Sequence, residues 1–278
     1  MKETSLYDIA SVTKVLATLQ TVMFLVDQKE IDVDKKISYY LKELKGTNKE
    51  DLVIRDILLH QAGLTPFIPH WTKTVNDKKA FDPAYLSTIP QKGFTERVAE
   101  NLYAISSIED SLWKWTVDSP LRGKPLFAKK YPYKYSDLTF YLMKRLVESK
   151  INQPMEDFLR QNVYLPLGAY STQYNPLNND VNKENIIPTA FDQYFRKVQI
   201  HGTVHDEGAA LSGGVGGHAG VFSNANDLAK ICQMNLQKGF YGGLNYLTPE
   251  TLQKFTKTSK EKNNRRGLGW DKPATKGL

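Results

Sequence analysis

Residues 12–26 carry the clearest helical pattern in the chain. Apolar residues recur there at intervals of three and four, and the remaining positions are mostly small or apolar as well. A helix of this kind is usually buried on most of its sides. Lys14 is the only charged residue in the stretch. The pattern therefore predicts a core helix with a single charge near its start. The periodic positions are Val12, Val15, Leu16, Leu19, Val22, Met23 and Val26.

Weaker patterns predict further helices and one strand. The helices are expected over 37–44, 51–59, 138–149, 154–163 and 225–237, and the strand over 198–204. From 65 to 132 the periodicity weakens among proline, lysine and aromatic residues, which predicts a long irregular excursion with short helices, of the kind that often forms substrate-binding walls. The glycine-rich stretch 205–220 is expected to be mobile. Strand candidates are few for a chain of this length.

Composition places the chain among ordinary globular proteins. It has 278 residues, of which 41% are hydrophobic and 24% charged, enough for one large domain or two intimate ones. The single cysteine, Cys232, excludes an intramolecular disulfide. The formal net charge of +7 favours anionic partners such as cell-wall polymers, acidic membrane surfaces or nucleic acid. No apolar run reaches the roughly 20 residues of a membrane span, no signal peptide is visible, and the histidines lack metal-ligand spacing.

The pattern Ser-x-x-Lys occurs three times, and its surroundings separate the three copies. Ser259 and Lys262 lie in a highly charged stretch, where water is expected to solvate every charge. Ser111 and Lys114 lie between tryptophans, where the lysine is expected to point outward or to stack on a ring. Neither of these two settings favours a catalytic role for the serine and lysine.

Ser11 and Lys14 differ from the other two pairs. Their spacing puts both side chains on one helix face, with Ser11 at the helix start, where free backbone N–H groups favour an anion. A lysine taken out of water has a lowered pKa, so it can serve as the base that a serine nucleophile needs. Tyr135 is a candidate to share a proton with Lys14. The alternative, a helix-capping serine and a lysine that reaches back to solvent, stays open, as does a capping role for Ser136 or Asp137.

These residues carry a resemblance to a known superfamily. Ser11-Val12-Thr13-Lys14 resembles the Ser-x-x-Lys motif of serine β-lactamases and penicillin-binding proteins. Tyr135-Ser136-Asp137 resembles the Tyr-x-Asn motif of the class C and D-Ala-D-Ala peptidase branch. Three further stretches are similar to family motifs in the expected order: 58–64 to Leu-Leu-Thr-His-Thr-Ser-Gly-Leu, 164–168 to a Pro-Leu-Gly-Met turn, and 213–229 to a Gly-Gly…Ser-Thr-Ala-x-Asp-Leu-Ala stretch.

The chain departs from the family pattern at several positions. Asp137 stands where the motif has Asn, Lys29 replaces a usual Gly, and Ala62 replaces a usual Ser. The third motif, Lys-Thr-Gly or His-Thr-Gly, is absent, because His218-Ala219-Gly220 belongs to the Gly-Gly stretch. In the family that motif lies on a later strand. We therefore interpret residues 1–278 as a β-lactamase-related domain that is incomplete at both ends.

The resemblance implies an α/β (α+β) fold of the β-lactamase/transpeptidase type. We expect a helix-rich chain that lacks much of the family's antiparallel sheet, with residues 65–200 forming a mostly helical lobe and its insertions. In particular, the sequence resembles the β-lactamase-like domains at the C-terminus of large bacterial proteins that begin with a glycoside hydrolase family 3 domain. A fusion of that kind is therefore expected in the parent protein.

The implied activity is that of a serine hydrolase acting through an acyl-enzyme on an amide or ester, in relation to the cell wall. The resemblance makes Ser11 the nucleophile, Lys14 its base, Tyr135 the proton relay and Asp137 a substrate-binding residue. It implies small-molecule or peptidoglycan-derived substrates, no cofactor, no metal, no nucleic acid, no transmembrane segment, and a periplasmic or secreted location. The second oxyanion donor would lie on the missing strand, so this chain alone is expected to be weak or inactive.

Two other functions remain as alternatives. One is a non-catalytic domain that keeps the fold and binds anionic cell-wall polymers. The other is a nucleic-acid binder, which only the net charge suggests, because the lysines are scattered and form no basic-aromatic motif. Asp206 and Glu207 lie beside the glycine-rich stretch, and a purely structural role is favoured for them.

Overall fold

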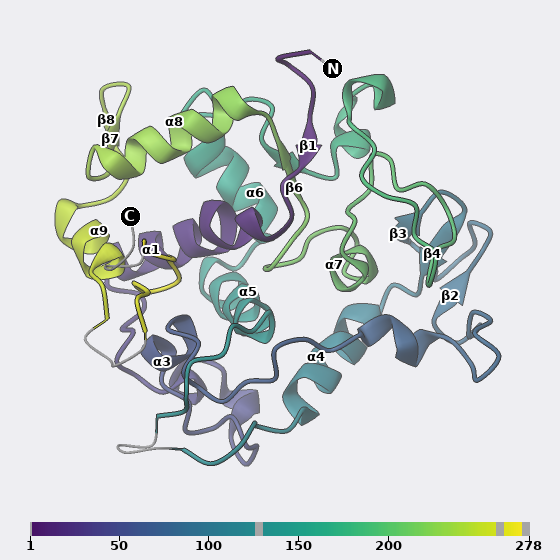
Figure 1. Ribbon diagram of the computed structural model, residues 1–278, viewed down its shortest axis with the longest axis horizontal. Coiled ribbons are helices and arrows are strands. Elements are labelled where there is room, and N and C mark those ends of the chain that lie inside the picture. Colours follow the sequence, from purple (N-terminus) through teal and green to yellow (C-terminus); the bar gives the residue numbers. More distant parts are fainter. Residues whose placement is uncertain (1, 126–129, 260–263, 274–278) are drawn as a thin grey trace.

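The computed structural model describes residues 2–125, 130–259 and 264–273. In this part of the chain the structure is rich in helices, which surround α1 and α5 near the centre (Figure 1). The helices are α1 Leu19–Asp27, α2 Ile37–Tyr40, α3 Ile54–Leu58, α4 Ile108–Asp118, α5 Leu138–Ile151, α6 Met155–Leu159, α7 Glu207–Leu211, α8 Ala225–Leu236 and α9 Pro249–Thr256. The strands are β1 Tyr7–Asp8, β2 Leu86–Ser87, β3 Glu96–Ala99, β4 Leu102–Ala104, β5 Gln173–Tyr174, β6 Val221–Ser223, β7 Phe240–Tyr241 and β8 Leu244–Asn245.

The predicted core helix over 12–26 is confirmed, with an irregular start. A 3₁₀ turn at Ala10–Val12 leads into a π-helical turn at Lys14–Thr18, and α1 follows. Most of the segment is buried, but Val12, expected in the core, is 44% exposed. Just beyond the end of α1, Lys29 has φ +63°, the left-handed conformation that glycine adopts most easily. This is the position where the family resemblance leads one to expect glycine.

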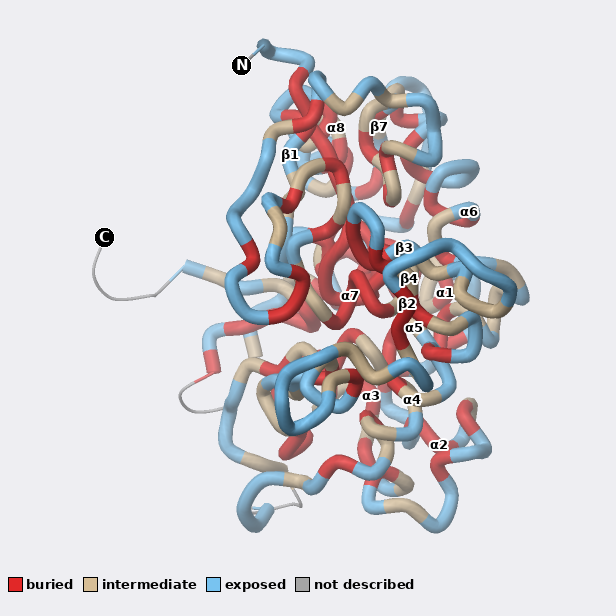
Figure 2. Tube along the Cα trace, turned by 90° about the vertical axis from the view of Figure 1, so that its right-hand side faces the viewer, coloured by how far each residue is buried: buried red, intermediate tan, exposed pale blue. Residues whose placement is uncertain are grey.

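The main hydrophobic core forms around α1. Side chains of α1 contact α5 and α9, and α5 also contacts α6. The buried residues run as a continuous band through the middle of the molecule (Figure 2). Apolar side chains spaced at three and four residues along these helices converge there, so burial of their faces stabilises the arrangement. Representative buried members are Leu19, Met23, Leu142, Leu146, Leu159 and Phe255.

Among the described residues the sheets are small and antiparallel. The first has the order β1-β6-β5, the second β2-β4-β3, and β7 pairs with β8. In the first sheet Tyr7 lies opposite Ser223 and Asp8 opposite Phe222. This pairing brings the residues before Ser11 beside the end of the glycine-rich stretch, over 200 positions later in the chain. The expected helix-rich fold with little sheet is therefore confirmed.

The strand predicted over 198–204 is wrong. In this range only Gln199 makes an isolated bridge, to Phe191. The chain instead closes around the buried guanidinium of Arg196, whose Nε donates to Asp192 Oδ2 at 2.7 Å and whose Nη1 donates to the Val204 carbonyl at 2.8 Å. Backbone hydrogen bonds do link the first part of the range to residues 189–192, since the Val198 and Ile200 carbonyls accept from Asp192 and Thr189, but they form no continuous ladder.

The excursion over 65–132 is more regular than predicted. It contains β2, β3, β4 and the eleven-residue helix α4, which pack with α7 around a second core.

The C-terminal end of α4 is held by Lys49, which is fully buried. Lys49 Nζ donates to the carbonyls of Val117 at 2.8 Å and Ser119 at 2.7 Å, the groups that a helix end leaves unpaired. Burial lowers the pKa of Lys49 to about 8. The division into a lobe over 65–200 stays a prediction.

Within the described residues, one helical segment, Ala10–Asp27, is long and apolar enough by composition to cross a membrane. In the structure, 67% of this segment is buried inside the protein. The core helix of a globular domain has the same length and composition, so burial accounts for its apolar character.

Candidate active site

Ser11 lies exposed on a tight turn between β1 and the core helix. The residue before it, Ala10, has φ +46°, a left-handed conformation that is unfavourable for residues other than glycine. Asp8 Oδ1 accepts a hydrogen bond from the Ala10 N–H at 2.8 Å, and the Ile9 N–H donates to the Val221 carbonyl at 3.0 Å. These contacts maintain the strained turn. As a result, the Ser11 hydroxyl stands at the surface at the start of the helix.

Lys14 is the buried partner of Ser11. Only 3% of its surface is exposed. Its Nζ lies 2.9 Å from Ser11 Oγ, 2.9 Å from the His218 carbonyl oxygen and 2.8 Å from Asp137 Oδ1. The first two contacts are hydrogen bonds, and the third is an ion pair. The structure thus brings together three of the four predicted site residues, Ser11, Lys14 and Asp137.

Tyr135, the fourth predicted site residue, lies against the same ammonium group. Lys14 Nζ is 5.3 Å from the centroid of the Tyr135 ring and 5.8 Å from that of Phe140, distances at which a ring face attracts a cation. The next two residues do not cap α5 with their side chains. Ser136 Oγ donates to the Thr65 carbonyl at 2.6 Å, and the Asp137 carboxylate turns to Lys14. The capping alternative is therefore not realised.

His60 holds the backbone of the Tyr135–Asp137 motif. The Ser136 N–H donates to His60 Nδ1 at 3.2 Å, and Thr139 Oγ1 lies 3.2 Å from the same nitrogen. The His60 ring lies 4.8 Å from the Tyr135 ring, centroid to centroid. Burial, with the charges of Arg266 and Lys14, lowers the pKa of His60 to about 3, so the ring is neutral at neutral pH, and the Ser136 N–H identifies Nδ1 as its acceptor nitrogen. Residues 58–64 resemble a family motif, but the sequence indicates no role for this side chain.

Arg266 brings a second cation to the aromatic residues of the motif. Its guanidinium carbon lies 5.6 Å from the Tyr133 ring centroid and 5.4 Å from that of Tyr135, and its Nε donates to the Tyr133 hydroxyl at 3.0 Å. The Tyr135 ring therefore lies close to two cations, Lys14 and Arg266. Arg266 was not identified from the sequence, because 131 positions separate it from Tyr135.

Residues 213–221, here called the glycine strap, run along the start of the core helix. Thr18 Oγ1 donates to the Gly217 carbonyl at 2.7 Å, Lys14 to the His218 carbonyl at 2.9 Å, and the Val221 N–H to Thr13 Oγ1 at 3.2 Å. A Cβ atom on Gly217 would lie 2.2 Å from the Phe140 carbonyl oxygen, so only glycine fits there. The expectation of a mobile stretch is wrong for this part, because the strap is mostly buried and bonded to the helix.

The other two Ser-x-x-Lys copies lie elsewhere. Lys114 points outward and pairs with Asp118 at 2.7 Å on the exposed face of α4, as expected from its surroundings. Lys262 lies outside the described residues. The copy at Ser111 therefore adds no second candidate nucleophile, and the structure does not test the copy at Ser259.

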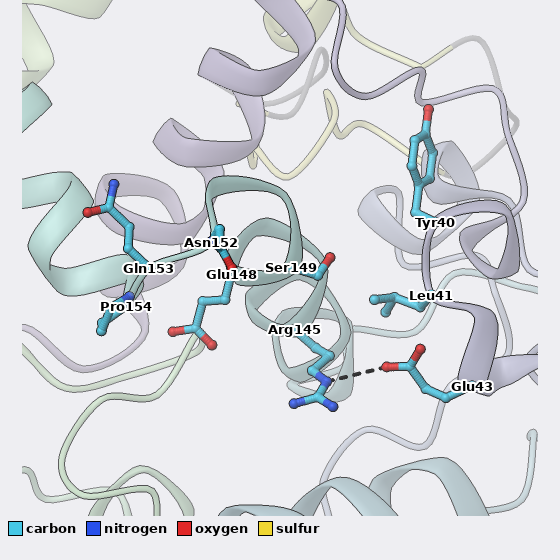
Figure 3. A pocket seen from close by; sticks show the side chains of 9 residues that line it. All are labelled: Tyr40, Leu41, Glu43, Arg145, Glu148, Ser149, Asn152, Gln153 and Pro154. Carbon is cyan, nitrogen blue, oxygen red and sulfur yellow. Dashed lines mark hydrogen bonds and ion pairs between the residues drawn. The ribbon is translucent and has the colours of Figure 1, made fainter.

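A surface pocket of about 540 Å³ lies at the C-terminal end of α5 (Figure 3). Arg145 and Glu43 pair across it at 3.3 Å. Asp137 precedes the N-terminal end of the same helix, so this pocket is separate from Ser11 and Lys14. Within the ranges described by the structure, no group of three or more His, Cys, Asp or Glu side chains is arranged to hold a metal ion.

Comparison with known proteins gives matches over almost the whole chain. Residues 1–277 match the family model described as Beta-lactamase. A protein of Escherichia coli (strain K12) named "Putative D-alanyl-D-alanine carboxypeptidase" is 33% identical over 285 residues, which cover 96% of this chain. The chain spans 58% of the length of that relative.

Two solved structures share the fold. The D-amino acid amidase from Ochrobactrum anthropi SV3, complexed with L-phenylalanine amide, superimposes with a TM-score of 0.63 at 16% identity, covering 97% of this chain and 66% of the amidase. The octameric penicillin-binding protein homologue from Pyrococcus abyssi superimposes with a TM-score of 0.62 at 15% identity, covering 95% of this chain and 53% of its own. At these identities the likeness concerns the fold alone.

Proposed function

Because this chain belongs to the β-lactamase family, we propose that it is a serine hydrolase that cleaves amide or ester bonds through a covalent acyl-enzyme. The observation that carries the proposal is the position of Lys14. Its Nζ lies 2.9 Å from the hydroxyl of an exposed serine and 2.8 Å from a carboxylate. A nucleophile, a base within hydrogen-bond reach and a group that orients the base are the parts that covalent catalysis requires.

The proposed reaction proceeds in two steps. Ser11 Oγ attacks the substrate carbonyl, an Oγ–C bond forms, and the hydroxyl proton passes to Lys14 once Nζ is neutral. The bond to the leaving amine or alcohol then breaks, and the leaving group takes that proton with the help of Tyr135. Water next attacks the acyl carbon and gives a proton to Lys14, the Oγ–C bond breaks, and Ser11 Oγ takes up that proton as the acid leaves. The Ser11 N–H, at the start of the helix, is a candidate donor to the oxyanion.

The substrate class is proposed from the relatives and from charge. One relative is named as a D-alanyl-D-alanine carboxypeptidase and one structural neighbour is a D-amino acid amidase, so amides of D-amino acids are the first substrates to test. The net charge of +7 suits acidic cell-wall material. Asp137 contributes a carboxylate that is 19% exposed beside Ser11, where a substrate N–H donor can reach it. Fusion to a glycoside hydrolase domain and a periplasmic or secreted location stay predictions.

Replacing Ser11 by alanine tests the proposal. Hydrolysis of a chromogenic ester, a β-lactam and a D-alanyl-D-alanine dipeptide is measured for the full-length wild-type protein and for its Ser11→Ala variant, and intact mass after exposure to a fluorescent penicillin reports the acyl-enzyme. We expect loss of turnover and of the mass adduct in the variant. Equal rates in the two proteins would remove the catalytic role of Ser11. An inactive wild type that still co-sediments with peptidoglycan would instead support the non-catalytic cell-wall-binding function.

A further inference from the structure

The glycine strap has one large side chain at the position where it touches Lys14. From Gly216 to Gly220 the sequence is Gly-Gly-His-Ala-Gly, so His218 carries the only side chain larger than a methyl group. Its backbone carbonyl accepts from Lys14 Nζ at 2.9 Å. A glycine-rich segment has many backbone conformations available, so this carbonyl needs an anchor to keep its place.

The His218 side chain supplies that anchor on the side away from Lys14. Its Nε2 lies 2.8 Å from Asp206 Oδ1, with the two side chains 3% and 24% exposed. The same Asp206 oxygen accepts the Ala209 N–H at 2.8 Å and so caps α7. The Tyr141 ring stacks on His218 with centroids 4.5 Å apart and planes 21° apart. His218 is therefore fixed by α7 on one side and by α5 on the other.

Electrostatics links this pair to the lysine. Burial opposes ionisation of Asp206, but the charge and hydrogen bond of His218, the Ala209 N–H and the charge of Lys14 together hold the pKa of that carboxyl well below its usual range. Lys14 thus has Asp137 in direct contact and a second carboxylate behind the strap. A lysine stem has several rotatable bonds, and holding it in one geometry requires fixed acceptors.

We propose that His218 and Asp206 are positioning residues for Lys14. Their contact fixes the peptide group of His218, whose carbonyl oxygen takes one of the three N–H donors of Lys14 and so keeps Nζ aimed at Ser11 Oγ. This inference rests on the proposed function, because it assigns these residues a part in acylation. It also replaces the purely structural role that the sequence favours for Asp206.

Two substitutions of His218 separate positioning from packing. His218→Gln keeps an amide N–H donor within reach of Asp206, whereas His218→Leu keeps bulk against Tyr141 without a donor. The rate of Ser11 labelling by a fluorophosphonate probe, kcat and KM for a chromogenic ester, and Tm are measured for both. We expect labelling and kcat to fall roughly 10- to 100-fold in His218→Leu with KM little changed, because small misplacements of a catalytic group have effects of that size. His218→Gln should restore most of the rate.

The control is His201→Leu. His201 is a hydrogen-bonded histidine whose Nε2 lies 2.9 Å from the Lys183 carbonyl and 2.8 Å from that of Ile186, and it does not contact the site. The His201→Leu variant should have a lower Tm but an unchanged labelling rate and kcat. Equal labelling rates in wild type and His218→Leu, or equal losses in His218→Leu and His218→Gln, would overturn the proposal.

If His218→Leu does not fold, Asp206→Asn takes its place. Asparagine retains an oxygen that can cap α7 but lacks the charge, so a several-fold loss of labelling is expected, and an unchanged rate would overturn the proposal. A wild-type protein that never labels would instead remove the proposed function itself. The two failures are therefore distinguishable.

Discussion

The Nζ atom of Lys14 lies 2.8 Å from Oδ1 of Asp137, so the buried lysine faces a carboxylate as well as the serine hydroxyl. This geometry gives a row of three groups, Ser11 Oγ, Lys14 Nζ and the Asp137 carboxylate. The carboxylate orients the lysine and stabilises its ammonium form, while the hydroxyl needs the neutral amine. Asp137 therefore helps to determine how Lys14 is held against Ser11.

The first prediction concerns Asp137→Asn. An amide oxygen can still accept from Lys14 but lacks the charge that holds the ammonium group in place, so we expect kcat for ester hydrolysis to fall roughly 10-fold. Rates of chromogenic ester hydrolysis check this. Lys14→Arg is the matched control, because a guanidinium cannot act as a base and should lower the rate on the order of 10³-fold. Equal rates in wild type and Asp137→Asn would contradict the assignment.

The second prediction concerns His60, which accepts the Ser136 N–H. His60→Leu leaves that buried N–H without its acceptor, and we expect a loss of about 1–3 kcal/mol in the free energy of unfolding together with lower activity. His60→Asn keeps an acceptor near the position of Nδ1 and should lose less of both. Urea unfolding and ester hydrolysis are compared for the two variants. The idea fails if His60→Asn is the more damaged of the two.

The third prediction concerns His70, which is buried between Trp115 and Tyr141. Among the described residues neither of its ring nitrogens has a hydrogen-bond partner. Phenylalanine has a similar shape without the unpaired groups, so His70→Phe should keep or raise stability at pH 7. A loss well above about 1 kcal/mol in urea unfolding would contradict this.

The same residue predicts a pH dependence. Burial, with the charge of His218, lowers the folded-state pKa of His70 from 6.5 to about 4. The unfolded chain therefore takes up a proton between these values that the folded chain does not, and the stability present above pH 6.5 is lost as the pH falls toward 4. His70→Phe should show a shallower loss between pH 6.5 and 4. Parallel pH curves for the two proteins would exclude this role of His70.

The fourth prediction concerns Lys49, whose pKa is lowered from 10.5 to about 8 by burial. The unfolded chain binds this proton more tightly than the folded one, so the unfavourable contribution is present below pH 8 and disappears as the pH rises to 10.5. Wild type should gain stability relative to Lys49→Met over this interval. The control is Lys114→Met, which changes a lysine on the exposed face of α4, the helix whose end Lys49 holds. This variant should show no such difference. Chemical unfolding at pH 7.5 and 9.5 measures both.

Local patterns and motif order were sufficient to predict α1, α2, α3, α5, α6 and α8 and the pairing of Ser11 with Lys14, whereas α7 and α9 were not among the predicted helices. Two residues three positions apart at the start of a helix are neighbours whatever the rest of the chain does. Apolar periodicity likewise predicts which helix faces are buried. The closeness of Tyr135 and Asp137 to Lys14 came from the family resemblance, because more than 120 positions of chain separate them. No local rule brings such segments together.

The residues missed are those whose partners are distant in sequence. His60 contacts Ser136, Arg266 contacts Tyr133, and His218 contacts Lys14, each across a long stretch of chain. The range 198–204, predicted as a strand, ends in a loop whose Val204 carbonyl accepts from the buried guanidinium of Arg196. Apolar-polar alternation reports which side of a segment is buried, but not that a charged group will organise it.

The glycine strap also limits which substitutions this protein can accept. Its contacts with the core helix are made by backbone atoms, and a Cβ atom on Gly217 or Gly220 would lie within 2.3 Å of a carbonyl oxygen. Tolerance at these positions is therefore set by size rather than by chemistry, so even alanine is excluded. Attempts to evolve new substrate preferences will find no room for a side chain at Gly217 or Gly220 and will have to vary other positions.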